Sequence, residues 1–228
     1  MSERIVFITG ASGGLGTFVT ESFLQQGDKV IGASRHVDSS EFPSPNFRAM
    51  SVDFTNQQQV HDAIAKVIAE FARLDVLVHV LGGFAGGQSI ATTDDATWER
   101  MQDLNLTSAF YVLRETIPHL RKSKNGRIVA IGSLAAKEPK ANLGAYVTFK
   151  SALSTLVQTV ALENADAGLT ANVILPDTMD TPANRQAMPK ADFSKWLNPK
   201  RVAELILWLA DEKAAQVTGT VIPIAGKL

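Results

Sequence analysis

A glycine-rich stretch near the start of the chain, Thr9-Gly10-Ala11-Ser12-Gly13-Gly14-Leu15-Gly16, most constrains what this sequence can fold into. It follows an apolar run over residues 4–8 and leads into a segment of helical period. Glycines in such a turn permit positive φ and close backbone approach, so that main-chain amides and the positive helix N-terminus can face a phosphate. The alternative is a tight turn without a ligand, but a position between a first strand and a first helix favours a dinucleotide site. The residues expected to bind it are Gly10, Ser12, Gly13, Gly14, Leu15 and Gly16.

The rest of the chain alternates short apolar runs with longer segments of helical period, which is typical of a parallel sheet with helices on both faces. The predicted strands cover residues 4–8, 29–33, 47–52, 76–80, 127–131, 170–175 and 220–224. The predicted helices cover residues 14–26, 56–71, 94–120, 143–167 and 198–210, the last with Asn198 as N-cap and Pro199 at the first helical position. The sequence therefore predicts an α/β fold, a single-domain Rossmann fold over residues 1–228 with a doubly wound parallel seven-stranded sheet.

Length, charge and cysteine content narrow the classes of function. A chain of 228 residues can bury one full core without disulfides or metals. A formal net charge of -1 gives no reason to expect nucleic acid or an anionic membrane as partner. The absence of cysteine excludes disulfides and thiolate metal sites, and no apolar run reaches membrane-spanning length. We expect a cytoplasmic protein with a small-molecule substrate and no metal.

One stretch, residues 176–197, lacks periodicity and contains three prolines with scattered methionine, phenylalanine and tryptophan. Long aperiodic segments in compact domains are often functional loops. Its position after the sixth predicted strand predicts a substrate lid over residues 177–197.

The end of the second predicted strand bears on the choice of nucleotide. Ser34 and Arg35 stand where an NAD-binding protein usually carries a carboxylate for the ribose 2′-hydroxyl. A guanidinium can form two hydrogen bonds with a 2′-phosphate, with Ser34 as a further donor, which favours NADP(H) over NAD(H). The alternative is that Arg35 is a solvated surface arginine, and NAD(H) then stays possible. Asp53, followed by Phe54 after the third strand, is a candidate acceptor for the adenine amino group, or else a turn or capping aspartate.

A candidate catalytic set spans two elements. Tyr146 and Lys150 are four residues apart on a predicted helix and share one face. A nearby ammonium stabilises a phenolate, so Tyr146 could serve as a general acid-base. Ser133 lies at the carboxyl end of the fifth strand, where open α/β sheets place ligands. Taken singly, the pair could be surface neighbours and the serine a turn residue.

Together with the glycine turn, Asn105, Ser133 and Tyr146-Val147-Thr148-Phe149-Lys150 resemble the short-chain dehydrogenase/reductase family. The resemblance implies that Tyr146 protonates a carbonyl oxygen, Lys150 holds the nicotinamide ribose and lowers the tyrosine pKa, Ser133 orients the substrate, and Asn105 supports a relay water. The resemblance also implies assembly into a dimer or tetramer through the helices at 94–120 and 143–167. It implies that Tyr146 and Lys150 contact the cofactor, and further cofactor contacts are expected at Gly82, Gly83, Pro176, Thr178 and Thr181.

Two segments depart from the usual family pattern. His79-Val80-Leu81-Gly82 replaces Asn-Asn-Ala-Gly, and Pro176-Asp177 replaces Pro-Gly. Both segments resemble the dihydropteridine reductase branch, which implies a quinonoid dihydropterin substrate and NADH, whereas Ser133 and Arg35 depart from that branch. His79 is expected to be a buried strand-end histidine. Residues expected to frame the pocket around a flat heterocycle, or alternatively a ketone, are Phe84, Met179, Met188 and Trp196.

These features favour an NADP(H)-dependent oxidoreductase that reduces a carbonyl or quinonoid dihydropterin-like substrate by hydride transfer. The alternative from another class is a non-catalytic protein that senses nicotinamide dinucleotides, since the same fold hosts both kinds of function.

Overall fold

All seven predicted strands form one parallel sheet in the order β3-β2-β1-β4-β5-β6-β7. The computed structural model describes residues 3–226, so residues 1–2 and 227–228 of the predicted domain lie outside the described range. The strands are β1 (Ile5–Thr9), β2 (Lys29–Ser34), β3 (Phe47–Ser51), β4 (Val76–His79), β5 (Arg127–Ile131), β6 (Thr170–Pro176) and β7 (Val221–Ile224). The predicted α/β architecture is confirmed, with strand ends displaced by no more than one residue.

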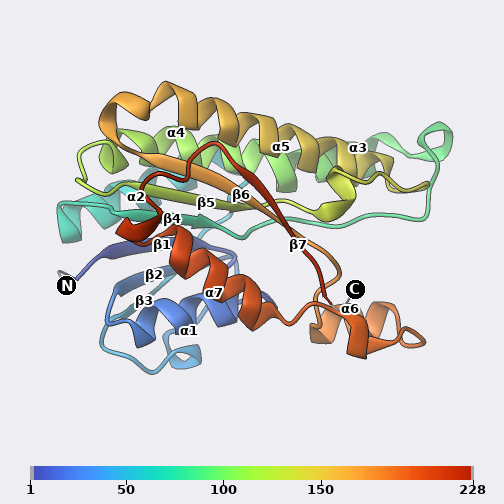
Figure 1. Ribbon diagram of the computed structural model, residues 1–228, viewed down its shortest axis with the longest axis horizontal. Helices are drawn as coiled ribbons and strands as arrows, with labels where there is room; N and C mark the ends of the chain where they lie inside the picture. The colour runs from blue at the N-terminus through green and yellow to red at the C-terminus, as the bar shows by residue number, and fades with distance from the viewer. Residues whose placement is uncertain (1–2, 227–228) are drawn as a thin grey trace.

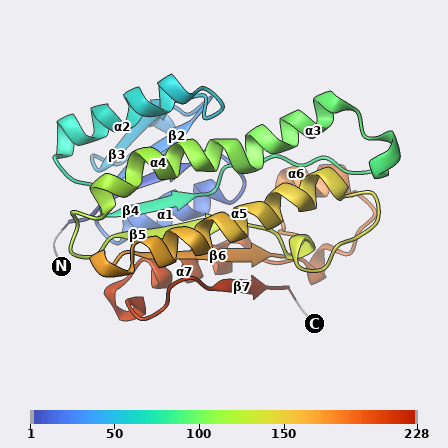
Figure 2. The same ribbon diagram turned by 90° about the horizontal axis from the view of Figure 1, so that it is seen from above.

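Helices cover both faces of the sheet (Figure 1 and Figure 2). The helices are α1 (Gly16–Gln25), α2 (Gln57–Phe71), α3 (Asp95–Gln102), α4 (Ser108–Leu120), α5 (Gly144–Glu163), α6 (Pro182–Ala187) and α7 (Pro199–Leu209). One core cluster packs β-strand residues against α2, α4 and α5, and a second packs the opposite face against α1 and α7. The strands are buried on both faces, which explains the nearly unbroken apolar runs in the sequence. In β1, for example, all five residues are buried.

The strand order reverses between β1 and β4. From β1 the chain builds outward to β2 and β3, and it then returns to the other side of β1 to build β4 through β7. The turn after β1 leads to α1 on one face, whereas the loop after β4 leads toward α3 and α4 on the other (Figure 2). Such a reversal opens a crevice at the carboxyl ends of the strands, which is where doubly wound folds bind ligands.

The helix predicted over residues 94–120 is not continuous. A π-helical segment, Asp103–Thr107, separates α3 from α4. The Asn105 side chain donates to the carbonyl of Met101 at 3.0 Å and so competes with the regular helical ladder. Short π segments are frequent at functional sites, and this one carries the asparagine that the sequence placed in the catalytic set.

Two other predicted segments differ in detail. The helix predicted over residues 143–167 ends at Glu163 and is followed by a single 3-10 turn, Ala165–Ala167. The aperiodic stretch contains α6, which Thr181 caps by accepting from the Asn184 amide at 3.3 Å, and a 3-10 turn at Phe193–Lys195. The predicted cap at Asn198 is confirmed, because its side chain accepts from the Lys200 amide at 2.9 Å. Within residues 3–226, no helix is both long enough and apolar enough to cross a membrane.

The packing of α5 on the sheet supplies a direct stability test. Leu153 is fully buried in the core, whereas Leu162 on the same helix is 81% exposed. Leu153→Ala should lower the free energy of unfolding by about 2–5 kcal/mol, because it removes buried methyl groups and leaves a cavity. Leu162→Ala should change it by less than about 0.5 kcal/mol. Urea denaturation measures both, and equal losses would contradict this packing.

Candidate active site

A cleft of about 850 Å³ opens at the carboxyl ends of the central strands. Its walls come from the glycine turn, the end of β2, the residues after β3, the loop after β4 and the start of the aperiodic stretch. Among the predicted cofactor residues, those that line it are Gly10, Ser12, Gly13, Gly14, Leu15, Ser34, Arg35, Asp53, Phe54, Gly82 and Thr181. Residues contributed by chain segments far apart in the sequence thus meet at the β1–β4 reversal.

The glycine turn is shaped for close approach of a ligand. Gly10 has φ of +71°, in the left-handed region that favours glycine. A Cβ atom on Gly14 would lie 2.9 Å from Cγ2 of Thr181, so only glycine lets the turn sit against the start of the aperiodic stretch. The first turn of α1 has no side-chain cap, which leaves its amides to a phosphate. This cradle and the size of the cleft fit the pyrophosphate of a dinucleotide.

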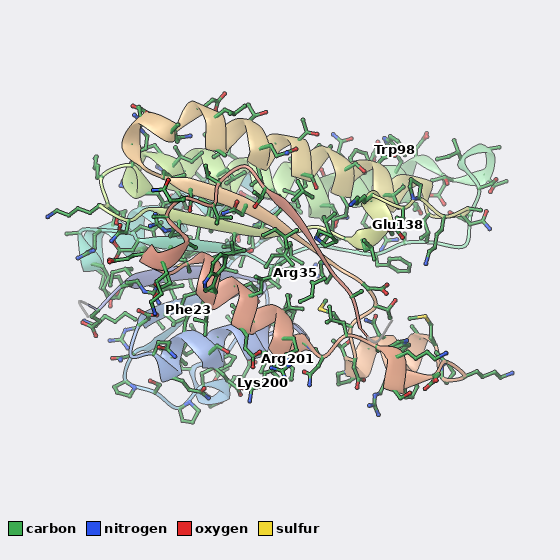
Figure 3. The ribbon with its side chains drawn as sticks, viewed as in Figure 1. Phe23, Arg35, Trp98, Glu138, Lys200 and Arg201 are labelled. Atoms are coloured by element: carbon green, nitrogen blue, oxygen red, sulfur yellow. The ribbon has the colours of Figure 1, made fainter. Side chains whose placement is uncertain are left out.

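Ser34 and Arg35 lie at one end of the cleft. The Ser34 hydroxyl is buried and accepts from the Ser12 amide at 3.4 Å, which joins β2 to the glycine turn. Arg35 is exposed and forms no salt bridge with a carboxylate in the part of the chain that the structure describes. In Figure 3, it lies between the helical layer that carries Trp98 and the layer that carries Arg201. A guanidinium placed at this rim can bind an anionic group.

Asp53 and Phe54 follow β3 at the same end of the cleft. The Asp53 carboxylate accepts from the amide and the hydroxyl of Thr55, at 3.0 and 2.8 Å. These bonds, led by the Thr55 hydroxyl, lower the pKa of Asp53. The turn geometry that was the alternative for this aspartate is therefore present, and the carboxylate also faces the cleft. Phe54 is buried edge-on against Phe7, so its backbone forms the cleft wall.

The four predicted catalytic residues lie outside the lining of the cleft, and two of them, Lys150 and Asn105, pack against Gly82, which lines it. A Cβ atom on Gly82 would lie 2.8 Å from Nζ of Lys150 and 2.9 Å from Oδ1 of Asn105, so glycine is required there. Asn105 accepts from the Gly83 amide at 3.1 Å and donates to its carbonyl at 3.0 Å. Lys150 donates to the Ile131 carbonyl, at the end of β5, at 2.8 Å. The relay candidates are therefore held by backbone groups next to the cleft lining.

Ser133 and Tyr146 complete this group. The Ser133 hydroxyl donates a hydrogen bond to Tyr146, which favours the phenolate, but burial dominates and raises the pKa of Tyr146. The net direction for Tyr146 in this structure is therefore upward, and the lowering of its pKa by Lys150 stays a prediction. Burial lowers the pKa of Lys150 to about 8, because a charged amine is poorly solvated there.

Besides Tyr146 and Lys150, four predicted cofactor residues lie outside the cleft lining. Gly16 begins α1 with its backbone packed on Gly10, and Gly83 is held by Asn105. Pro176 is the last residue of β6, and the backbone carbonyl of Thr178 accepts a hydrogen bond from the Leu197 amide at 2.9 Å. They support the walls of the cleft rather than line it.

The predicted aromatic frame is only partly assembled. Phe84 stacks edge-to-face on Tyr146 with ring centroids 5.0 Å apart, and it is 65% exposed. Met179 lines the cleft, but Trp196 packs on Phe193 instead. The sequence did not predict the other residues that line the cleft, because no motif marks them. They are Thr17, Phe18, His36, Thr55, Val80, Leu81, Leu104, Ile131, Pro182, Ala183 and Asn184. Phe18 alone had a signal, because it follows Leu15 by three residues and so lies on the same face of α1.

His79 is buried, as the sequence predicts for a strand-end histidine. Its Nδ1 lies 3.0 Å from the Thr9 hydroxyl, across the β1–β4 pair. Burial, followed by the charge of Lys150, lowers the pKa of His79 to about 3, so the imidazole is neutral. Over residues 3–226, no cluster of three or more metal-ligating side chains occurs.

Comparison with known proteins places this site in a family. Residues 4–192 match the model of the short chain dehydrogenase family, and the chain therefore belongs to that family. It is 31% identical to short chain dehydrogenase mpl6 of Monascus purpureus over 230 residues, covering 95% of this chain and 78% of that protein. The structure of ElxO with NADP bound superposes with a TM-score of 0.90 at 27% identity, covering 97% of both chains. The ligand-free aldohexose dehydrogenase of Thermoplasma acidophilum gives a TM-score of 0.89 at 30% identity, covering 97% of this chain and 92% of that one. The chain is therefore an oxidoreductase of this family.

Burial of Lys150 makes stability depend on pH in a predictable direction. The pKa of Lys150 is about 8 in the folded protein, against 10.5 for a lysine side chain exposed to water. Between these values the unfolded chain binds the proton and the folded one does not, so stability rises with pH, by about 3 kcal/mol over the window. Lys150→Met should abolish this rise, whereas Lys66→Met, at an exposed position, should keep it. Chemical denaturation of nucleotide-free protein from pH 7 to 10.5 measures the difference, and parallel curves for wild type and Lys150→Met would contradict it.

Proposed function

We propose that this protein is an NADP(H)-dependent reductase of carbonyl compounds, with Tyr146 as the acid-base group. The observation that carries the proposal is that one crevice is lined both by Ser34 and Arg35 and by Gly82, against which Lys150 and Asn105 pack. The other two members of the predicted catalytic set, Ser133 and Tyr146, are hydrogen bonded to each other. A nucleotide that spans the crevice has its 2′-phosphate beside a guanidinium and its nicotinamide beside the tyrosine.

The residues that would hold the cofactor follow from this geometry. The glycine turn and the first turn of α1 suit the pyrophosphate, Arg35 and Ser34 the 2′-phosphate, and Asp53 with the Phe54 backbone the adenine. Lys150 suits the nicotinamide ribose, and Thr181 suits the carboxamide. The segments around them are supported by Gly82, Gly83, Pro176 and Thr178. The NADP bound in the ElxO structure supports the same choice of nucleotide. NAD(H) is the alternative, since the Arg35 side chain is exposed and could be a solvated surface arginine.

A reduced nicotinamide, when bound, supplies hydride to the substrate carbonyl carbon. Tyr146 then gives its hydroxyl proton to the carbonyl oxygen, which Ser133 orients by hydrogen bonding. A raised tyrosine pKa keeps Tyr146 protonated and ready for this step. Lys150 and Asn105, which both pack against Gly82, would hold the relay that returns the proton.

Substrate choice is tied to the loop after β4. Phe84 covers Tyr146 with an exposed ring, and Met179 lines the cleft, so the substrate space is apolar. This supports a flat or apolar carbonyl compound, with a quinonoid dihydropterin as the narrower candidate. No observation favours the non-catalytic alternative.

Two properties inferred from the sequence also belong to the proposal. Exposed Phe110 on α4 supports the association of copies through α4 and α5 into a dimer or tetramer. The stretch at residues 177–197, which reaches the cleft through Met179 and Thr181, would act as the lid. A cytoplasmic location remains a prediction from the cysteine-free composition.

Removal of the tyrosine hydroxyl tests the acid-base role. Tyr146→Phe should lower kcat by about 10²–10⁴-fold with little change in NADPH affinity, because only proton transfer is lost. Tyr111→Phe, on α4, is the matched control and should behave as wild type. Oxidation of NADPH with a panel of ketones, aldehydes and quinonoid dihydropterins provides the rate, and full activity of Tyr146→Phe would overturn the assignment.

Removal of the guanidinium tests the choice of nucleotide. Arg35→Ala should weaken NADPH binding by about 30-fold, the equivalent of about 2 kcal/mol for a charge-assisted contact, and leave NADH binding unchanged. Fluorescence titration of the reduced nicotinamide measures both affinities, with Arg114→Ala as a control on α4. A wild-type preference for NADH would contradict the 2′-phosphate interpretation and favour the dihydropterin reductase alternative.

A further inference from the structure

His79 has no part in the chemistry proposed above, yet it is buried beneath it. The residue is 1% exposed, and its Nε2 has no hydrogen-bond partner among the described residues. Buried polar atoms are nearly always paired, and an orphaned one is a cost to stability. Native proteins retain such costs mainly at functional sites. This position therefore calls for a functional explanation.

The contacts of Thr9 supply one. Thr9 is the last residue of β1 and directly precedes Gly10 of the glycine turn. Its hydroxyl oxygen accepts from the Leu81 amide at 3.3 Å, and its carbonyl accepts from the Val80 amide at 3.2 Å. Thr9 thus holds the loop after β4 next to the glycine turn, and both of these segments line the cleft.

The Thr9 hydroxyl joins His79 to the loop after β4. Its oxygen has two lone pairs and carries one hydrogen, so it can accept from the Leu81 amide and form a second hydrogen bond with Nδ1 of the neutral His79 at 3.0 Å. The contact with His79 therefore holds the Thr9 side chain in the position from which it accepts from Leu81.

The loop that Thr9 holds determines where Gly82 lies. Gly82 follows Leu81 directly, and both Lys150 and Asn105 lie so close to it that there is no room for a Cβ atom. The next residue, Gly83, is fixed by its two hydrogen bonds with Asn105. A shift of Leu81 would therefore change how Gly82 packs against Lys150 and Asn105.

We propose that His79 is a positioning residue: through its hydrogen bond with the Thr9 hydroxyl it sets the spacing between the glycine turn and Gly82, the residue that Lys150 and Asn105 contact. The inference rests on the proposed function and adds to it a residue that touches neither substrate nor cofactor. It accounts for the retention of a buried imidazole with one unpaired nitrogen. Misplacement of reacting groups by about 1 Å can cost about a hundredfold in rate, so a small shift here has a large effect on turnover.

The test compares substitutions that keep or remove the Thr9 contact. His79→Leu removes both ring nitrogens, and it should lower kcat by about 10- to 100-fold and weaken NADPH binding, while the unfolding midpoint in urea stays equal or rises. His79→Asn places an amide atom near the position of Nδ1, and it should restore most of the activity and affinity. Thr9→Val removes this contact together with the Leu81 hydrogen bond, so it should lose at least as much activity as His79→Leu, and the double variant should lose no more than Thr9→Val alone.

Thr170→Val is the matched control. Thr170 begins β6 at the opposite end of the sheet, and its buried hydroxyl also lacks a partner among the described residues. This variant should gain stability without a change in kcat or NADPH affinity. If His79→Leu fails to fold, Thr9→Val and His79→Asn carry the same comparison.

Wild-type turnover and affinity in both His79→Leu and Thr9→Val would overturn the inference and leave the proposed function intact. Loss of activity in proportion to a loss of stability, without rescue by His79→Asn, would also overturn it, since that is the behaviour of a merely structural residue. A wild-type protein that bound no dinucleotide would overturn the inference and the proposed function together.

Discussion

The pairing of β1 with β4 is the interaction on which the rest of the structure depends. In this pair Thr9 lies opposite His79, and the strand order reverses on either side of it. Because the connections after the two strands run to opposite faces of the sheet, no helix closes the space above their carboxyl ends. The cleft, the glycine turn and the relay residues all owe their position to this reversal.

The site is made of polar groups that the fold must hold away from water. Lys150 and Asn105 are almost fully buried, and each is hydrogen bonded to backbone groups. Backbone anchoring fixes both groups to the ends of strands and to one helical segment, which move little. The cost appears as a lowered lysine pKa, an irregular π-helical segment and an unpaired histidine nitrogen. These irregularities coincide with the proposed catalytic end of the cleft.

Much of this arrangement could be predicted from the sequence, and the exceptions have physical causes. The strands were readable because burial on both faces demands continuous apolar runs, and the glycine turn because Gly10 and Gly14 meet backbone and side-chain constraints that other residues cannot satisfy. The break at Asp103–Thr107 was not readable, since it arises when Asn105 bonds to Gly83, a contact distant in sequence. The raised pKa of Tyr146 was missed for a similar reason, because burial depends on the packing around it. Likewise, the sequence could not show that Trp196 packs on Phe193 while Phe84 covers Tyr146.

The central claim is that one nucleotide spans the crevice from Arg35 to Tyr146. A crystal structure of the protein grown with NADPH tests it most directly. The account predicts the 2′-phosphate within hydrogen-bond distance of Arg35 and Ser34, the pyrophosphate against the glycine turn, and the nicotinamide ribose at Lys150. A nucleotide bound elsewhere, or bound in the crevice with its nicotinamide at Arg35, would contradict it.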